Sequence, residues 1–210
     1  MVLISHRYKF IHLRNTKVAS SSVESFFGQF CVDPAEPYEF KDFREEIVSS
    51  YGIIGNKVGG SWASHMNAKD IKEKMGDELF TTYIKFCVVR NPYDWMVSAY
   101  HWIKRGDREH SDFKKMIGFT LCAYPKNIDR ILLYGQPICD YYLRYENLKE
   151  DMVMLLDKLG ITEYNIEDLP NFKSDTRPKG IPYQDYYDEE TRAMVANIFK
   201  TEIEMFGYTF

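Results

Sequence analysis

The segment Val89-Arg90-Asn91-Pro92-Tyr93-Asp94-Trp95-Met96-Val97-Ser98 is the most informative part of this chain. It ends the apolar, β-prone run 83–89, which predicts a buried strand. Asn91 and the proline after it are typical of a helix start, because the side chain can cap the helix and proline suits its first position. Arg90 is therefore expected at the carboxyl end of a strand, where open α/β sheets bind ligands, with Ser98 nearby on the helix. An arginine beside a hydroxyl suits a phosphate, although the same turn also fits an arginine that only pairs with a carboxylate.

A second polar turn lies near the N-terminus. Residues 9–13 read as a short strand, residues 14–22 as a polar turn, and a helix follows in which Ser21 and Glu24 fit a capping box. Such a turn directs backbone N–H groups, the positive helix end and three serine hydroxyls at one point, with Lys17 beside it. This arrangement suits a phosphate, and an ordinary capped helix with a solvated lysine is the alternative.

Together the two segments resemble the cofactor-binding motifs of sulfotransferases that use 3′-phosphoadenosine 5′-phosphosulfate (PAPS). Residues 17–22, Lys-Val-Ala-Ser-Ser-Ser, resemble the first motif, commonly Lys-Thr-Ala-Gly-Thr-Ser, which holds the 5′-phosphosulfate. The segment from Arg90 to Ser98 resembles the second motif, whose arginine and serine hold the 3′-phosphate. The resemblance implies nucleotide contacts from Lys17, Ala19, Ser20, Ser21, Ser22, Arg90 and Ser98. Ser20 stands where glycine is usual, so a requirement for positive φ there would strain the serine or reshape the loop.

Later segments extend the resemblance over nearly the whole chain. Residues 144–148, Arg-Tyr-Glu-Asn-Leu, resemble the family's Tyr-Glu-Asp-Leu segment, which implies that Tyr145 lies against the adenine. The basic loop 173–180 is similar to the loop that closes over the nucleotide, with a solvated surface turn as the alternative. That similarity implies contacts from Arg177, Lys179 and Gly180. The tail 186–210 resembles the closing helix of many bacterial and carbohydrate-directed members.

Strand-like and helix-like segments alternate along the chain. Strands are expected at about 8–13, 83–89 and 138–143, and helices at about 21–30, 67–75, 92–105, 112–118, 126–134, 147–159 and 188–206. This order predicts a three-layer α/β/α fold with a mainly parallel central sheet. The resemblance adds a likeness to P-loop nucleotide hydrolases and a single sulfotransferase domain over residues 1–210.

Composition excludes some classes of protein. The net charge of −4 provides no basic field for nucleic acid, so anion binding has to come from local groups. The four cysteines are scattered without a Cys-x-x-Cys pair, which favours thiols over disulfides or metal ligands. No apolar run reaches membrane-span length and no signal-peptide core is visible, so a cytoplasmic protein without a membrane span is expected.

The resemblance also implies the chemistry. PAPS would donate its sulfuryl group in line to a hydroxyl, leaving adenosine 3′,5′-bisphosphate (PAP), with no metal required. By analogy with phosphoryl transfer, Lys17 would neutralise the charge that grows on the oxygen between phosphorus and sulfur. Of the five histidines, His65 is the best candidate base, because it precedes Asn-Ala-Lys-Asp-Ile much as the family's histidine precedes Ala-Lys-Glu-Ile. An unperturbed imidazole suits proton abstraction near neutrality, and a histidine that only shapes the turn is the alternative.

Two other functions stay open. A P-loop nucleotide kinase should carry Gly-x-x-x-x-Gly-Lys-[Ser/Thr] and a magnesium-binding acid, whereas here Lys17 precedes the serines and the loop has no glycine. A non-catalytic nucleotide-binding protein of the same fold is the second. The acceptor pocket is expected in regions 33–61 and 106–124. The resemblance favours a glycan or glycolipid acceptor over another hydroxyl compound.

Overall fold

The chain divides into two compact units. Unit 1 comprises residues 1–89 and 127–172, and unit 2 comprises residues 90–126 and 173–210. The computed structural model describes residues 1–41, 45–56, 59–104, 112–123, 126–172, 177–178 and 180–210.

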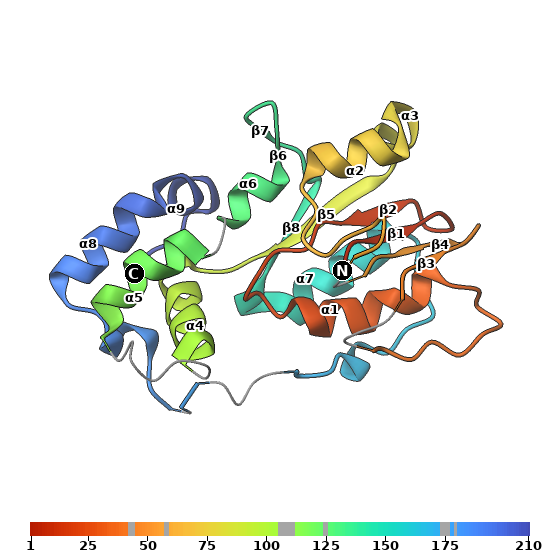
Figure 1. Cartoon of the computed structure of the whole chain (residues 1–210). Helices are drawn as coiled ribbons and strands as arrows, with labels where there is room; N and C mark the ends of the chain where they lie inside the picture. The colour runs from red at the N-terminus through yellow and green to blue at the C-terminus, as the bar shows by residue number, and fades with distance from the viewer. Residues whose placement is uncertain (42–44, 57–58, 105–111, 124–125, 173–176, 179) are drawn as a thin grey trace. The chain divides into compact units, whose positions relative to one another are not determined.

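Unit 1 is built on a mixed sheet whose described strands run in the order β3-β4-β1-β2-β5-β8 (Figure 1). The strands are β1 (Leu3–Ser5), β2 (Phe10–His12), β3 (Ile47–Val48), β4 (Gly52–Ile54), β5 (Ile84–Val89) and β8 (Tyr141–Arg144). β2, β5 and β8 pair in parallel, whereas β1 pairs antiparallel with both β2 and β4, and β3 pairs antiparallel with β4. The expected α/β class is confirmed, but the sheet is mixed rather than mainly parallel. The antiparallel additions β1, β3 and β4 are only two or three residues long, too short to produce a readable period.

The parallel strands determine where the segments that follow them begin. Ile11 pairs with Lys85, and Val88 pairs with Leu143, so the three strands are aligned along their length. Their carboxyl ends meet at one edge of the sheet. The segments that follow β2, β5 and β8 therefore all start from the edge at which open α/β sheets bind ligands.

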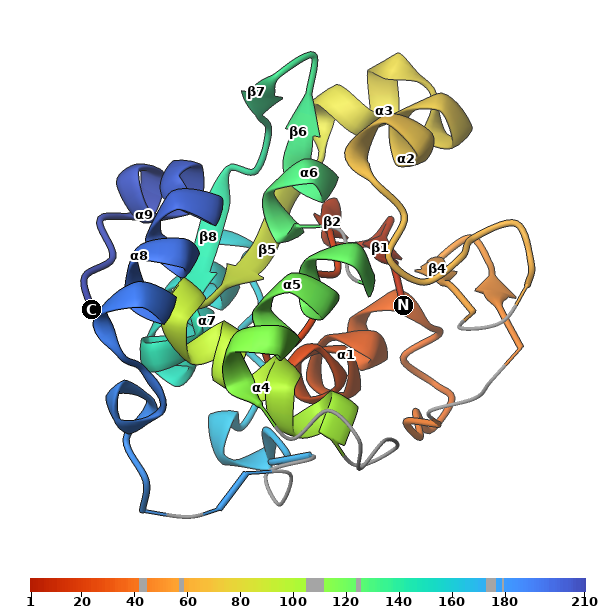
Figure 2. The same ribbon diagram turned by 60° about the vertical axis from the view of Figure 1, so that its left-hand side comes forward.

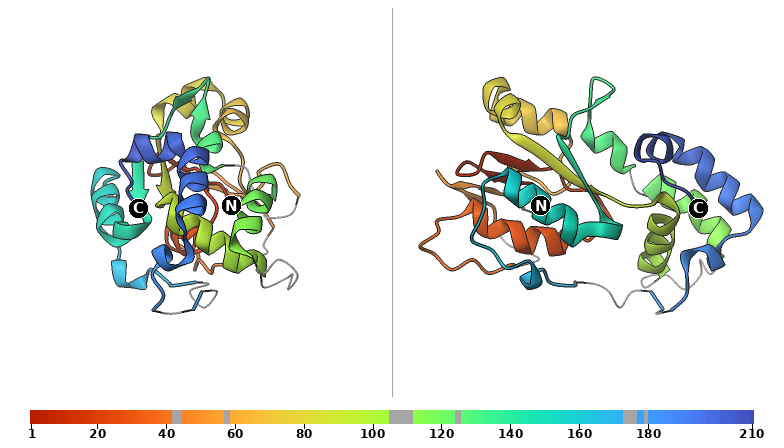
Figure 3. Two further views of the ribbon diagram at one scale, coloured as in Figure 1. Left: turned by 90° about the vertical axis from the view of Figure 1, so that its left-hand side faces the viewer. Right: turned by 180° about the vertical axis from the view of Figure 1, so that it is seen from behind.

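Phenylalanines form the centre of unit 1. The ring of Phe27, on α1 (Ser20–Phe27), lies 5.6 Å from that of Phe10 on β2 and 4.9 Å from that of Phe86 on β5. Helix α7 (Leu148–Lys158) buries Met152, Leu155 and Leu156. Figure 3 shows α1 and α7 on the same side of the sheet. These contacts hold the carboxyl end of α1 against β2 and β5.

The remaining elements of unit 1 include the predicted helix at 67–75. The structure contains this helix as α2 (Ala68–Met75). Asn67 caps it by accepting a hydrogen bond from the N–H of Asp70 at 2.9 Å, and Gly76, with φ 82°, ends it. Unit 1 further contains α3 (Asp77–Thr82), α6 (Asn127–Ile131), β6 (Leu132–Leu133), β7 (Gln136–Pro137) and the short 3₁₀ turns η1 (Gly28–Cys31), η2 (Tyr145–Asn147) and η3 (Ile166–Asp168).

Unit 2 is helical. It contains α4 (Pro92–Lys104), α5 (Phe113–Ala123), the 3₁₀ turn η5 (Tyr183–Tyr186), α8 (Glu189–Ile198) and α9 (Lys200–Phe206), and α4 packs against α5 and α8 (Figure 2). One continuous closing helix was expected, but the chain leaves helical geometry at Phe199 and divides it into α8 and α9. The Phe199 ring, at this break, packs 5.5 Å from that of Trp95 on α4.

Candidate functional site

The loop between β2 and α1 (residues 13–19, the β2–α1 loop) is closed by buried hydrogen bonds. The Asn15 side chain donates from Nδ2 to the carbonyl of Val88 at 2.9 Å, which attaches the loop to the end of β5. The Ser20 hydroxyl donates to the carbonyl of Asn15. Because its proton is used there, a contact between Ser20 and an anion is limited to the backbone N–H.

Backbone strain in this loop lies on either side of Val18. Lys17 has φ 59° and Ala19 has φ 58°, whereas Ser20 is the first residue of α1 and is absent from the residues with positive φ. The left-handed positions are therefore 17 and 19, and the serine that replaces the usual glycine carries no such strain. Val18 between them is only 1% exposed, so its burial holds the two strained residues in place.

Helix α1 begins without the predicted capping box. Ala19 occupies the N-cap position and provides no side-chain cap. Glu24, which was expected to complete the box, is fully buried and pairs with Arg14 Nη1 at 2.9 Å. The prediction was wrong because burial in an ion pair outweighs a surface capping bond. Ser21 and Ser22 lie in the first turn, and the hydroxyl oxygen of Ser22 accepts from the N–H of Phe172 at 3.3 Å. Among the described residues the Ser22 hydroxyl makes no bond as a donor, so its proton suits an anion at the positive end of the helix.

Asn127 of α6 fixes the residue next to Lys17. Its Oδ1 accepts from the backbone N–H of Thr16 at 2.8 Å and from the Thr16 hydroxyl at 3.0 Å, while its Nδ2 donates to the Thr16 carbonyl at 3.0 Å. The same Oδ1 accepts from Arg130 Nη1 at 3.1 Å. One amide side chain thus binds both backbone groups of Thr16, as a neighbouring strand would. The position of Lys17 therefore depends on α6.

His65 is attached to the same loop. Its Nδ1 lies 3.3 Å from the carbonyl oxygen of Arg14, and Arg14 Nη1 donates to the hydroxyl of Ser64 at 3.2 Å. A carbonyl only accepts, so Nδ1 carries the proton in this contact and Nε2 presents a lone pair. The structure thus joins two predicted catalytic residues through one short loop, because Arg14 and Lys17 are three residues apart.

The surroundings of His65 change its acidity. Burial, the largest cause, and the nearby positive charges of Arg14 and Arg130 together lower the pKa of His65 to about 3. The expectation of an unperturbed imidazole was therefore wrong. With this pKa, the imidazole of His65 is uncharged near neutral pH when no ligand is bound.

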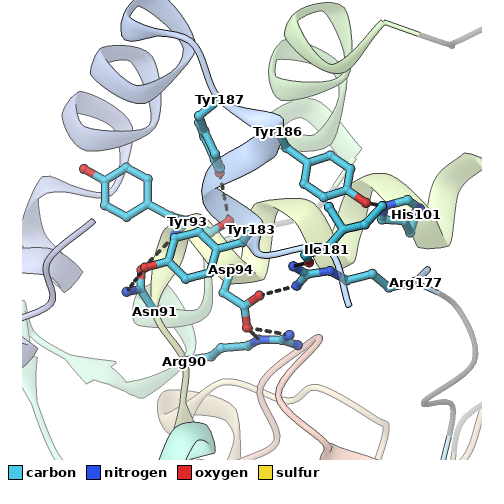
Figure 4. A network of polar contacts seen from close by, with 10 residues as sticks. All are labelled: Arg90, Asn91, Tyr93, Asp94, His101, Arg177, Ile181, Tyr183, Tyr186 and Tyr187. Carbon is cyan, nitrogen blue, oxygen red and sulfur yellow. Dashed lines mark hydrogen bonds and ion pairs between the residues drawn. The ribbon is translucent and has the colours of Figure 1, made fainter. Parts of the chain in front are cut away.

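In unit 2, Arg90 and Arg177 share one carboxylate, that of Asp94 (Figure 4). Asp94 Oδ2 accepts from Arg90 Nε at 2.8 Å, and its Oδ1 accepts from Arg177 Nη1 at 2.6 Å. Arg90 thus makes the carboxylate pair that was the alternative to phosphate binding. Ser98 is half-buried one helical turn beyond Asp94, on the same face of α4. Asn91 caps this helix as predicted, accepting from the N–H of Tyr93 at 3.1 Å.

The other predicted contacts are only partly described. Tyr145 follows β8 directly and is 36% exposed, and Gly180 is exposed with φ 83°. Lys179 lies outside the described residues. The predicted site residues of unit 1 are Lys17, Ala19, Ser20, Ser21, Ser22, His65 and Tyr145, and those of unit 2 are Arg90, Ser98, Arg177 and Gly180.

Comparison with known proteins identifies the class. A model of the sulfotransferase family matches residues 1–126, and the chain belongs to this family. An uncharacterized protein of Archaeoglobus fulgidus is 32% identical over 103 residues, which cover 47% of this chain and 85% of that protein. No solved structure is significantly similar to the chain. In the part of the chain that the structure describes, no helix has the length and apolar character needed to cross a membrane.

Four residues of the site were not anticipated: Arg14, Asp94, Asn127 and Arg130. Asp94 belongs to the Arg90–Ser98 motif. Its position four residues after Arg90, about one helical turn, could have predicted an ion pair between the two side chains. Asn127 carried no signal, because its partner Thr16 lies 111 residues away in sequence. Arg130 carried none, because only the fold brings its charge near His65.

Proposed function

We propose that this protein transfers the sulfuryl group of PAPS to a hydroxyl of a glycan or glycolipid. The acceptor oxygen forms a bond to sulfur as the bond from sulfur to the phosphate oxygen breaks, and PAP leaves. Family membership supports sulfuryl transfer as the type of reaction. The observation that carries the rest is the attachment of His65 to the loop that bears Lys17.

Each residue has a proposed task. Lys17 stabilises the charge on the oxygen that leaves sulfur, and His65 Nε2 takes the proton of the acceptor hydroxyl. Ser21, Ser22 and the backbone N–H groups of Ala19 and Ser20 bind the 5′-phosphosulfate. The 3′-phosphate is bound by Arg90 and Ser98, the adenine lies against Tyr145, and the segment with Arg177, Lys179 and Gly180 covers the nucleotide.

A base whose pKa is about 3 is weak, but the nucleotide changes its surroundings. Bound phosphosulfate brings negative charge to the loop beside His65 and opposes the effect of Arg14 and Arg130. The pKa of His65 therefore rises in the complex, although burial, the largest cause of its low value, remains.

We also propose the three-layer arrangement of P-loop-like sulfotransferases, with residues 1–210 acting as one sulfotransferase domain. The parallel pairing of β2, β5 and β8 and the placement of the three following segments support it.

Isothermal titration and an acceptor screen test the proposal. PAP should bind tightly without magnesium and ATP weakly, and PAPS labelled with ³⁵S should transfer its label to a glycan or glycolipid. Magnesium-dependent ATP binding would instead indicate a kinase. Tight PAP binding without transfer to any acceptor would indicate a nucleotide-binding protein without catalysis.

A further inference from the structure

The backbone of His65 is left-handed. Its φ is 63°, in the turn that Ser64 and His65 form shortly before the cap of α2. Positive φ is uncommon for a residue other than glycine, and such a conformation persists only where neighbouring contacts hold it. The proposed base therefore stands at a point where the chain needs support.

Arg14 supports this turn at two points. Its carbonyl oxygen lies 3.3 Å from Nδ1 of His65, and its Nη1 donates to the hydroxyl of Ser64 at 3.2 Å. One contact comes from the backbone of Arg14 and the other from the end of its side chain. Two separate contacts fix the orientation of the turn as well as its position, whereas a single hydrogen bond would let it rotate.

Glu24 fixes the side chain of Arg14. The Oε1 of Glu24 lies 2.9 Å from Nη1 of Arg14, and the two side chains are 0% and 7% exposed. The same oxygen pairs with the amino group of Met1, so the carboxylate has a second cationic partner. A buried arginine keeps its carboxylate, because an uncompensated buried charge is costly. The guanidinium of Arg14 therefore has little freedom to leave Ser64.

Stability alone gives little reason to bury this ion pair. Apolar side chains of similar volume are often as stabilising as a buried pair, so the burial of Glu24 with Arg14 favours a role in orientation. The pair also lies in a suitable place for such a role. Arg14 belongs to the β2–α1 loop, and Glu24 lies on α1, two residues after Ser22. The pair thus connects the turn of His65 to both the loop and the helix of the proposed phosphosulfate site.

We infer that Glu24 and Arg14 are positioning residues, which together hold the Ser64–His65 turn so that Nε2 of His65 faces the acceptor hydroxyl. The inference rests on the proposed function, in which His65 is the base. In this role neither residue touches the reacting groups. Glu24 orients Arg14, and Arg14 orients the turn. The contact with the Arg14 carbonyl keeps the proton of the imidazole on Nδ1, which leaves Nε2 able to accept the proton of the acceptor.

Nitrogen NMR of histidine-labelled protein tests the hold on His65 directly. The two neutral tautomers of an imidazole give different ¹⁵N spectra, and the signals that disappear in His65→Asn are those of His65. In the wild-type protein, His65 should carry its proton on Nδ1. Glu24→Gln removes the charge that fixes Arg14, so the signals of the Nε2–H tautomer should appear in that variant.

Turnover and PAP affinity separate positioning from general damage. Glu24→Gln should slow transfer of ³⁵S from PAPS to the glycan found in the acceptor screen by about tenfold or more, because a small displacement of a catalytic group suffices for such a loss. PAP affinity, measured by isothermal titration, should change less than about threefold, since the base does not touch the nucleotide.

Two further variants complete the test. Ser64→Ala removes only one of the two contacts with Arg14, so its turnover should fall by about fivefold with PAP affinity intact. Glu167→Gln is the matched control, because it removes a carboxylate of unit 1 that pairs with Lys149 on the surface at 2.6 Å. It should leave the tautomer, the turnover and the PAP affinity unchanged.

Several results would overturn the inference. Wild-type His65 with its proton on Nε2 would remove the contact on which the inference depends. An unchanged tautomer in Glu24→Gln, whatever its turnover, would show that the ion pair does not hold the turn. A loss of PAP affinity as large as the loss of turnover would make Glu24 a general structural residue. If Glu24→Gln does not fold, Ser64→Ala decides, and wild-type turnover and tautomer in that variant would refute the role of Arg14.

Failure of the proposed function gives a different result. Wild-type protein that binds PAP but transfers no sulfuryl group would refute the function, while a changed tautomer in Glu24→Gln would still show that the ion pair positions His65. Wild-type protein that transfers the group, with turnover unchanged in Glu24→Gln, would refute the inference alone.

Discussion

Replacing Asn127 with alanine should loosen the loop that carries Lys17. The substitution removes three hydrogen bonds with Thr16 and one with Arg130. A hydrogen bond contributes about 1 kcal/mol net, and water can reach the half-buried Thr16 and replace part of the loss. We therefore expect the free energy of unfolding to fall by about 2 kcal/mol. Displacing Lys17 by about 1 Å should cost turnover about 10²-fold.

Urea denaturation and transfer of labelled sulfuryl from PAPS measure the two effects. Asn127→Asp keeps an acceptor for the Thr16 N–H but places an oxygen against the Thr16 carbonyl, so turnover should again fall. Asn165→Ala is the control in the same unit, because Asn165 caps η3 on the surface by accepting from the N–H of Glu167 at 3.2 Å. It should lose some stability but keep full turnover. Wild-type turnover in Asn127→Ala would refute the dependence of Lys17 on α6.

Three further predictions concern residues with proposed direct roles. His65→Asn should abolish turnover and leave PAP affinity nearly intact, because the base touches the acceptor. Lys17→Ala should reduce turnover by about 10²-fold, about 3 kcal/mol, with a smaller loss of PAP affinity, because its charge matters most as the leaving group develops. Arg90→Ala and Ser98→Ala should weaken PAP by about 2–4 and about 1 kcal/mol respectively, measured against adenosine 5′-phosphosulfate, which lacks the 3′-phosphate.

The pKa of His65 gives an independent check through stability. The unfolded imidazole has a pKa of 6.5 and the folded one about 3, so between these values only the unfolded state binds the proton. Wild-type stability should therefore fall as the pH is lowered from about 7 to 4, and His65→Asn should reduce the slope. Buried His12, whose pKa is also well below 6.5, contributes in the same direction and is unchanged by that substitution. Identical slopes in the two proteins would show that His65 is not buried as described.

Local features were predictable from the sequence because they depend on neighbours along the chain. The cap at Asn67, the stop at Gly76 and the strand end at Val89 all follow from residues within one helical turn or one strand. The family motifs identified Lys17 and Arg90 in the same way, although binding by either residue stays a prediction.

Features that depend on distant contacts were not predictable. Asn127 meets Thr16 across 111 residues, and Arg177 meets Asp94 across 83. The pKa of His65 depends on burial and on two arginines that only the fold places nearby. The Ser21–Glu24 pair shows how a local pattern can mislead. Its spacing fits a capping box, but Glu24 instead forms a buried ion pair with Arg14.

The left-handed residues beside Val18 determine which mutations the β2–α1 loop can accept. A β-branched residue at position 17 or 19 would be strained, since left-handed geometry costs an L-residue about 1 kcal/mol or more. Position 20 has no such restriction, because it lies within the helix. Over evolutionary time, the glycine usual at that position can be lost without reshaping the turn, while glycine or asparagine would be the easiest replacements for Ala19.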